Sequence, residues 1–365
     1  MRFRSVVATI AALALSLVPA PPAAAEIDKS DNIKLLRSFR YAGTNHPPEA
    51  TDDYFLGGTD IAFQGRLIYA MQQGESGGVH VFKHPRDRGR PQKVAFIPCP
   101  GEQNDVAVVK PGLIALGYHN STCAGKPGGG VRLIDVSDPK RPSYLGAVND
   151  LPGGTHTLTV YPGKPIIYAS PGGLPVNGGG TQQIIDVSDP NKPKVAATYQ
   201  PSPNGCHDIT FYIKKDTKLA FCPGLTETQI WDVSDPLAPT AIAHIPQEGQ
   251  MVFPHSVAVT FDGKYAIIGD ENFEAHECEG GPTGAMWMYD IQNPRTPIPL
   301  GYYSIPRGQV STASSRANWC TAHLFNFVPG TYVLVASWYA AGMNVVDFSD
   351  MQNPQELSHY MGTGD

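Results

Sequence analysis

Short stretches of alternating apolar and polar residues recur along most of the chain, and no amphipathic helical period competes with them. In one recurring phrase the stretch leads into a Ser-Asp-Pro turn, where Asp or Ser can bind the turn backbone and Pro presets φ. Three close copies read VRLIDVSDPKRP from Val131, QQIIDVSDPNKP from Gln182 and TQIWDVSDPLAP from Thr228. Weaker copies begin at Val79, Met286 and Met343. The pattern predicts strands that end in turns capped by Asp.

A second alternating phrase precedes each copy and reads TDIAF, NDVAV, HTLTV, HDITF, HSVAV and HLFNF. Its copies begin at Thr59, Asn104, His156, His207, His255 and His323. With the strands around it, each unit holds four short strands, and units of this length repeated six times are typical of a propeller. We therefore predict an all-β fold, a β-propeller with six countable repeat units, as a single domain over residues 26–365.

The strand that follows each turn occurs seven times, because IKLLRSF near residue 33 and QELSHYM near the end both fit its pattern. Either six blades close with one spare strand, or a further unit belongs after Asp365. In the second case, the strand near residues 33–40 pairs in a different blade from the strand near residues 356–361.

The N-terminus has the pattern of a secretion signal. Arg2 and Arg4 precede an apolar run from Val6 to Val18, and small Ala residues up to Ala25 supply a cleavage site. We predict a signal peptide over residues 1–25 and a secreted mature chain, with an uncleaved membrane anchor as the alternative. No later stretch is long and apolar enough to span a bilayer. The net charge of −6 argues against a nucleic-acid partner, which normally requires a basic footprint.

All six cysteines lie in the predicted mature region, and an even number in an exported chain indicates disulfides. The repeat decides among the possible pairings, because two cysteines flank one hairpin and two others enclose another. We predict the pairs Cys99–Cys123, Cys206–Cys222 and Cys278–Cys320. The alternative for Cys206 is a thiolate ligand of a metal.

Four consecutive units carry histidine at the first position of the second phrase: His156, His207, His255 and His323. The first strand of a propeller blade lines the central channel, so these side chains are expected at one mouth of it. Converging imidazoles with few carboxylates favour Zn, Cu, Fe or Ni over Ca or Mg. The alternative is structural, in which each imidazole bonds a neighbouring loop and no ion binds.

Carboxylates accompany the histidines in this register. Asp60, Asp105 and Asp208 occupy the next position of the phrase, where they could orient imidazoles or complete the ligand shell. Glu271 ends a returning strand at the same mouth and is the candidate general base, with Asp208 as its candidate catalytic partner.

The most specific stretches are CPGEQNDVAV at Cys99, GCHDITF at Gly205, FPHSVAV at Phe253, NWCTAHLFN at Asn318 and ASWYAAGMNVVDFSD from Ala336. They resemble the LVIVD-repeat family of secreted actinobacterial propellers, over about residues 30–365. This resemblance implies a seven-bladed propeller whose last unit follows the end of this chain. A more remote similarity is to selenium-binding, methanethiol-oxidase-type propellers, which also gather His near the channel.

Two functions fit these observations. The first is a secreted propeller that binds a divalent transition metal and acts as a hydrolase or an oxidase on a small molecule. The second is a non-catalytic extracellular interaction module, whose rim the disulfides stiffen for an unknown ligand. The sequence does not choose between hydrolysis and oxidation.

Overall fold

The computed structural model of the chain is built of β-strands throughout its described part, and no described helix is long and apolar enough to cross a membrane. The described residues are 28–34, 58–86, 89–102, 104–121, 123, 128–171, 180–200, 205–224, 226–246, 249, 251–272, 281–306, 319–339 and 341–361. The predicted signal peptide lies outside them, as does most of the predicted strand near residues 33–40.

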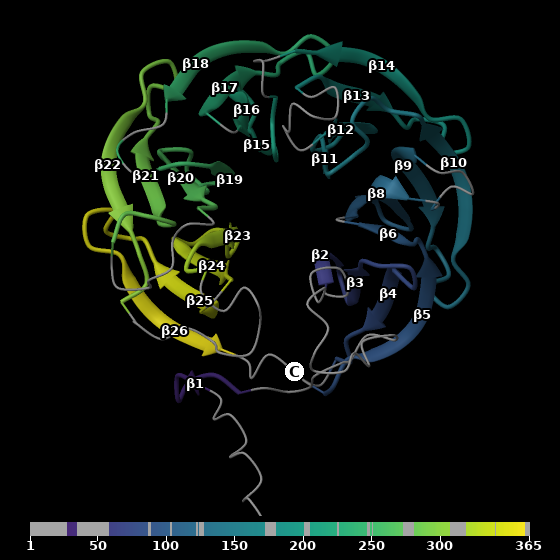
Figure 1. Cartoon of the computed structure of the whole chain (residues 1–365), viewed down its shortest axis with the longest axis horizontal. Helices are drawn as coiled ribbons and strands as arrows, with labels where there is room; N and C mark the ends of the chain where they lie inside the picture. Colours follow the sequence, from purple (N-terminus) through teal and green to yellow (C-terminus); the bar gives the residue numbers. More distant parts are fainter. Residues whose placement is uncertain are drawn as a thin grey trace, which may run out of the picture.

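Six antiparallel sheets stand around a common centre as the blades of a propeller (Figure 1). Blade one consists of β2 (Gly58–Gln64), β3 (Leu67–Gln72), β4 (Gly78–Lys83) and β5 (Gln92–Pro98). Blade two consists of β7 (Asp105–Lys110), β8 (Leu113–Ser121), β9 (Gly128–Asp135) and β10 (Ser143–Asn149), with the short β6 (Gly101–Glu102) paired to β8. Blade three consists of β11 (Thr157–Val160), β12 (Ile166–Ser170), β13 (Gln182–Asp186) and β14 (Lys194–Tyr199).

The other three blades repeat this order. Blade four consists of β15 (Thr210–Ile213), β16 (Lys218–Pro223), β17 (Glu227–Asp232) and β18 (Thr240–Pro246). Blade five consists of β19 (Pro254–Val259), β20 (Tyr265–Asp270), β21 (Met286–Asp290) and β22 (Ile298–Tyr303). Blade six consists of β23 (Ala322–Phe327), β24 (Val333–Trp338), β25 (Gly342–Asp347) and β26 (Gln355–Met361), and β1 (Asp28–Lys29) pairs with β26. The predicted all-β propeller with six units is confirmed.

The two repeated phrases have separate places in each blade. The second phrase forms the innermost strand, and the Ser-Asp-Pro turn joins the third strand to the fourth. In blade two, Asp135 accepts a hydrogen bond from the Ser137 N–H (2.8 Å), and Asp138 accepts one from the Lys140 N–H (3.1 Å). Asp189 and Asp235 accept equivalent bonds. The predicted capping of these turns is therefore confirmed.

The hydrophobic core lies between neighbouring blades. Five clusters of buried side chains are present in the described part of the chain, one at each junction from blades one and two to blades five and six. At the first junction, Tyr69 and Met71 of blade one pack with Val106 and Leu116 of blade two. Blades two to five are thus stabilised by burying both faces against their neighbours, whereas blades one and six bury one face each in these clusters.

The junction between blade six and blade one differs from the other five. Ile61 is 51% exposed, whereas Ile209, at the same position of the repeat in blade four, is 2% exposed. On the other side, Met343 of blade six is 37% exposed, whereas the equivalent Met286 of blade five is fully buried. Figure 1 shows blades six and one standing further apart than the other neighbours. A seventh unit stays a prediction.

Disulfides join the predicted partners in two hairpins. Cys99 bonds Cys123 and Cys206 bonds Cys222, with Cα atoms 4.3 and 5.1 Å apart. Both pairs were predicted and are confirmed, and the thiolate alternative for Cys206 is therefore wrong. The third predicted pair includes Cys278, which lies outside the described residues.

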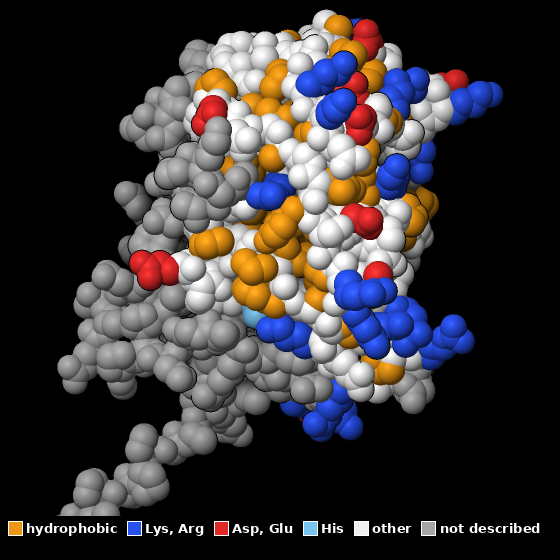
Figure 2. All heavy atoms as spheres, turned by 90° about the vertical axis from the view of Figure 1, so that its right-hand side faces the viewer, with side chains coloured by type: hydrophobic (Ala, Val, Ile, Leu, Met, Phe, Trp, Pro, Cys, Tyr) orange, Lys and Arg blue, Asp and Glu red, His pale blue; other side chains and the backbone are white. Residues whose placement is uncertain are grey.

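The two faces of the ring have different surfaces. The Ser-Asp-Pro turns all end on one face, and exposed Lys140 and Arg141 lie in one of them. In the side view of Figure 2, Lys and Arg side chains gather toward the right-hand edge of the molecule. The innermost strands begin at the opposite face, and the predicted metal ligands lie there.

A pair of matched substitutions tests the exposure at the open junction. Ile209→Ala removes a side chain buried between blades three and four, so it should lower the free energy of unfolding by about 2–5 kcal/mol. Ile61→Ala, at the same repeat position, should cost less than about 1 kcal/mol because its side chain is half exposed. Urea denaturation measures both values. Equal losses would show that Ile61 is covered in solution.

Candidate metal centre

Hydrogen bonds between neighbouring blades hold the backbone of two of the histidines. The Thr157 hydroxyl, next to His156, donates to the carbonyl oxygen of His207 (2.6 Å). The Ser256 hydroxyl, next to His255, likewise donates to the carbonyl oxygen of His323 (2.6 Å). These bonds hold the first residue of one innermost strand beside the next, and so bring side chains from consecutive blades together.

The four predicted histidines form one continuous row. Their ring centroids are 4.5 Å apart from His156 to His207, 4.1 Å from His207 to His255, and 4.5 Å from His255 to His323. His119 of blade two extends the row, with its ring 6.3 Å from that of His156. The row therefore spans blades two to six.

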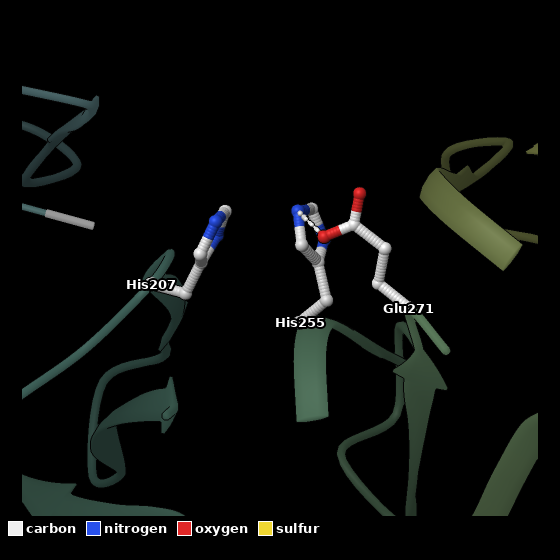
Figure 3. A group of neighbouring side chains, drawn as sticks. All are labelled: His207, His255 and Glu271. Atoms are coloured by element: carbon white, nitrogen blue, oxygen red, sulfur yellow. Dashed lines mark ion pairs between the residues drawn. The ribbon is translucent and has the colours of Figure 1, made fainter. Parts of the chain in front are cut away.

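Only two of these histidines belong to the tightest donor group. His207, His255 and Glu271 each offer one ligand atom, and the three atoms lie within 4.8 Å of one another. Figure 3 shows the His207 and His255 rings side by side, with the Glu271 carboxylate on the far side of His255. Glu271, expected as a general base, is thus placed among the possible ligands, while His156 and His323 flank the group.

Burial keeps the imidazoles of His156, His207 and His255 neutral. It lowers the pKa of His156 to about 4, and it holds the pKa values of His207 and His255 well below their usual range, with the neighbouring imidazoles adding to the effect. The Nδ1 atom of His207 is buried and has no hydrogen-bond partner. Neutral imidazole is the form that binds a metal, and an unpaired buried nitrogen is costly unless a ligand occupies it.

Glu271 lies between two histidines and a tyrosine. Its Oε2 atom is 3.3 Å from His255 Nε2, and its Oε1 atom is 3.5 Å from His323 Nε2. The Tyr339 hydroxyl donates to Oε1 at 2.6 Å. Since Tyr339 binds Oε1, the other oxygen is the one that faces His255. The His323 side chain is 29% exposed against 3% for His255, so water reaches the group from the side of blade six.

Thr321 fixes the backbone on both sides of Glu271. Its hydroxyl donates to the Asp270 carbonyl oxygen and accepts a hydrogen bond from the Asn272 N–H (2.8 Å). Its own carbonyl oxygen accepts a hydrogen bond from the Tyr339 N–H (3.2 Å). A fully buried threonine of blade six therefore positions Glu271 of blade five and Tyr339 together.

Each of the three aspartates predicted to accompany the histidines accepts a hydrogen bond from a backbone N–H group. Asp60 accepts a hydrogen bond from Val106 N–H (3.3 Å), Asp105 from Leu158 N–H (2.6 Å), and Asp208 from Ile209 N–H (2.7 Å). Asp60 and Asp105 thereby tie blade one to two and blade two to three.

These aspartates also have unusual acidities. Burial raises the pKa of Asp208 to about 7, and the nearby Asp60 adds to the rise. Burial also raises the pKa of Asp105 well above its usual range, and Asp60, which hydrogen-bonds it, raises it further. The predicted role of Asp208 in orienting imidazoles stays a prediction.

Of the two residues that position Glu271, Tyr339 could be predicted from the sequence and Thr321 could not. Tyr339 ends a returning strand at the same mouth as Glu271, and its position in the repeat places it there. Thr321 precedes the innermost strand of blade six, and no pattern in the sequence distinguishes it from other loop threonines.

Solved structures share the fold of this chain. The periplasmic gluconolactonase of Pseudomonas aeruginosa matches with a TM-score of 0.62 and 11% identity, over 84% of this chain and 86% of that chain. A candidate 6-phosphogluconolactonase of Bacteroides fragilis matches with a TM-score of 0.61 and 10% identity, over 83% and 87%. The hydrazine synthase of Kuenenia stuttgartiensis matches with a TM-score of 0.57 and 12% identity, over 86% and 81%.

Structural matches at such low sequence identity show only that the chain has a β-propeller fold. No protein-family model matches the chain, and no curated protein matches it. The resemblance to the LVIVD-repeat family therefore stays a prediction.

The substitution Asp105→Asn tests the buried carboxyl pair. Because the folded-state pKa of Asp105 is raised, the native chain keeps a proton that the unfolded chain releases, so this group makes wild-type stability fall as pH rises above about 4. Between about pH 5 and pH 8, the free energy of unfolding of the variant should exceed that of the wild type by about 1 kcal/mol. Urea denaturation measures both values.

The exposed turn residue Asp138, whose pKa is lowered mainly by its bond to Arg141, serves as the control. Asp138→Asn should show no such gain. Parallel pH profiles for Asp105→Asn and the wild type would contradict the assignment of a retained proton.

The substitution Thr321→Val tests the clamp on Glu271. Valine keeps the shape but leaves the Asn272 N–H without its hydroxyl partner, which should lower the free energy of unfolding by about 1–3 kcal/mol. Thr321→Ser keeps the hydroxyl and should cost less than about 1 kcal/mol. Thermal and urea denaturation compare the two. Similar losses in both variants would show that the methyl group, not the hydroxyl, matters here.

Proposed function

We propose that the protein binds one divalent transition-metal ion through His207, His255 and Glu271, and that this centre hydrolyses a small molecule. The observation that carries the proposal is the convergence of ligand atoms from three buried residues within 4.8 Å of one another, with a buried unpaired nitrogen on His207. A structural role for His207 would supply a partner for that nitrogen.

The donor set favours particular ions. Two neutral imidazoles and one carboxylate suit Zn, Cu, Fe or Ni, and two histidines with one glutamate are also a ligand set of catalytic zinc sites that keep a position open. An ion in such a site acts as a Lewis acid that polarises a carbonyl group and acidifies water. The same donors hold redox-active iron in other proteins, so the identity of the bound metal decides between hydrolase and oxidase.

The residues around the ligands have separate tasks in this proposal. Tyr339 holds Oε1 of Glu271 and so leaves the other oxygen for the ion. His323, which is partly exposed, is placed to exchange a proton with substrate or water. His156 stays neutral at physiological pH and can accept or donate a hydrogen bond on the other side. Asp208, beside His207, remains the candidate for orienting the imidazoles.

Two further observations guide the choice of a substrate class and of a cellular location for the protein. The gluconolactonase of P. aeruginosa shares the fold, which makes a small lactone or ester the first substrate class to test. The two disulfides and the N-terminal signal pattern support export to an extracellular location. The extracellular ligand of a non-catalytic module remains the alternative if no metal binds.

Metal analysis of the exported protein tests the proposal. The wild type should retain about one transition-metal ion per chain after dialysis, and His207→Ala should reduce the occupancy at least about tenfold, because it removes one of three ligands. His84→Ala is the control, since His84 lies in a turn of blade one and bonds Pro85 O (2.7 Å). Wild type without metal, or equal occupancy in both variants, would refute the proposed centre.

A further inference from the structure

His207 is the proposed metal ligand that lies furthest from its own strand. β15 begins at Thr210, three residues after His207, whereas β19 includes His255. β19 also pairs with β20 on both sides of His255, through Pro254 and Ser256. Paired strands therefore hold the backbone around His255, and another constraint has to hold the backbone of His207.

A disulfide supplies that constraint. Cys206, the residue before His207, is bonded to Cys222 of β16, and their Cα atoms are 5.1 Å apart. Cys222 pairs on its other side with Gln229 of β17. β16 and β17 are the two middle strands of blade four, and both cysteines are buried in the core between blades three and four. The bond therefore ties the segment that carries His207 to the interior of the sheet.

Two hydrogen bonds also hold His207, but both of them end on its backbone. Its N–H donates to the Pro223 carbonyl oxygen (2.7 Å), and its carbonyl oxygen accepts a bond from the Thr157 hydroxyl (2.6 Å). The buried Nδ1 atom of the ring has no hydrogen-bond partner, so this nitrogen does not fix the imidazole. Hydrogen bonds open locally in native proteins, whereas a covalent bond limits how far the segment can move. The place of the imidazole therefore depends on the backbone that Cys206 anchors.

We propose that the Cys206–Cys222 disulfide positions His207 as a metal ligand, and that the metal centre reaches its full affinity only after this pair is oxidised. The inference rests on the metal centre proposed above. Groups that orient a ligand change metal affinity by about 10- to 100-fold when they are removed. Cys206 and Cys222 are thus positioning residues, which act on the ion through His207.

Oxidation of this pair links the metal centre to the proposed export of the protein. In thiol–disulfide exchange the thiols of Cys206 and Cys222 lose two electrons and two protons, while a protein disulfide of the exporting compartment gains them and becomes a dithiol. A reducing cytosol keeps both thiols reduced. The site is therefore completed after the chain has left the cytosol, and the ion is bound tightly only there.

Zinc titration of the metal-free protein compares the loss of two disulfides. The test variant carries Cys206→Ala and Cys222→Ala, and the control variant carries Cys99→Ala and Cys123→Ala. The test variant should bind Zn²⁺ at least about tenfold more weakly than wild type, and the control should stay within about threefold of it. The control bond spans a sequence separation of 24 against 16, so its loss should lower stability at least as much. A weaker affinity in the test variant alone therefore reports the position of His207.

Amide hydrogen exchange of the metal-free protein provides a second readout, which needs no metal. The His207 N–H should exchange at least about tenfold faster in the test variant than in wild type, and at the wild-type rate in the control. Circular dichroism shows whether each variant folds. If the alanine variant does not fold, serine at both Cys206 and Cys222 takes its place, because serine is close to cysteine in size.

The outcomes separate the role of the disulfide from the metal centre itself. Equal zinc affinities in wild type and the test variant, equal losses in the two variants, or unchanged exchange at His207 would overturn the role of the disulfide and leave the metal centre standing. Wild type that binds no transition-metal ion would instead refute the metal centre, and this inference with it.

Discussion

The structure depends on side chains of one innermost strand bonding the backbone of the next blade. Thr157 and Ser256 each hold the carbonyl oxygen of the histidine that follows in the ring, and Asp105 holds the next strand through Leu158 N–H. These bonds, with the apolar cores between blades, fix how far apart consecutive strands stand. The spacing of the imidazole row is therefore a consequence of how the blades pack, although His207 and Glu271 themselves lie just outside the strands.

The same packing determines the chemistry available there. Because His207 and His255 are buried, their imidazoles are neutral, and the Nδ1 atom of His207 has no hydrogen-bond partner. Glu271 supplies the negative charge that a divalent ion needs, and Thr321 and Tyr339 hold it in place. A buried nitrogen without a hydrogen-bond partner costs stability, which is common where function competes with packing.

Much of the fold could be predicted from the sequence, since the alternating strands and Ser-Asp-Pro turns repeat with little variation. The histidine row followed from register, because one aligned column of inner strands meets at one face. The roles of individual residues in the site could not be predicted from the register. Whether Glu271 ligates or acts as a base depends on side-chain reach across two blades, and the clamp by Thr321 depends on a contact that no local pattern encodes. The exposure of Ile61 likewise depends on how blades six and one are spaced.

The central claim is that His207, His255 and Glu271 hold a metal ion. Anomalous X-ray diffraction, recorded on either side of the absorption edge of the metal found in the exported protein, tests it most directly. The account predicts one strong peak about 2.0–2.2 Å from one nitrogen of each histidine and from one Glu271 oxygen. No peak at these residues in crystals of metal-containing protein, or a single peak elsewhere in the ring, would contradict it.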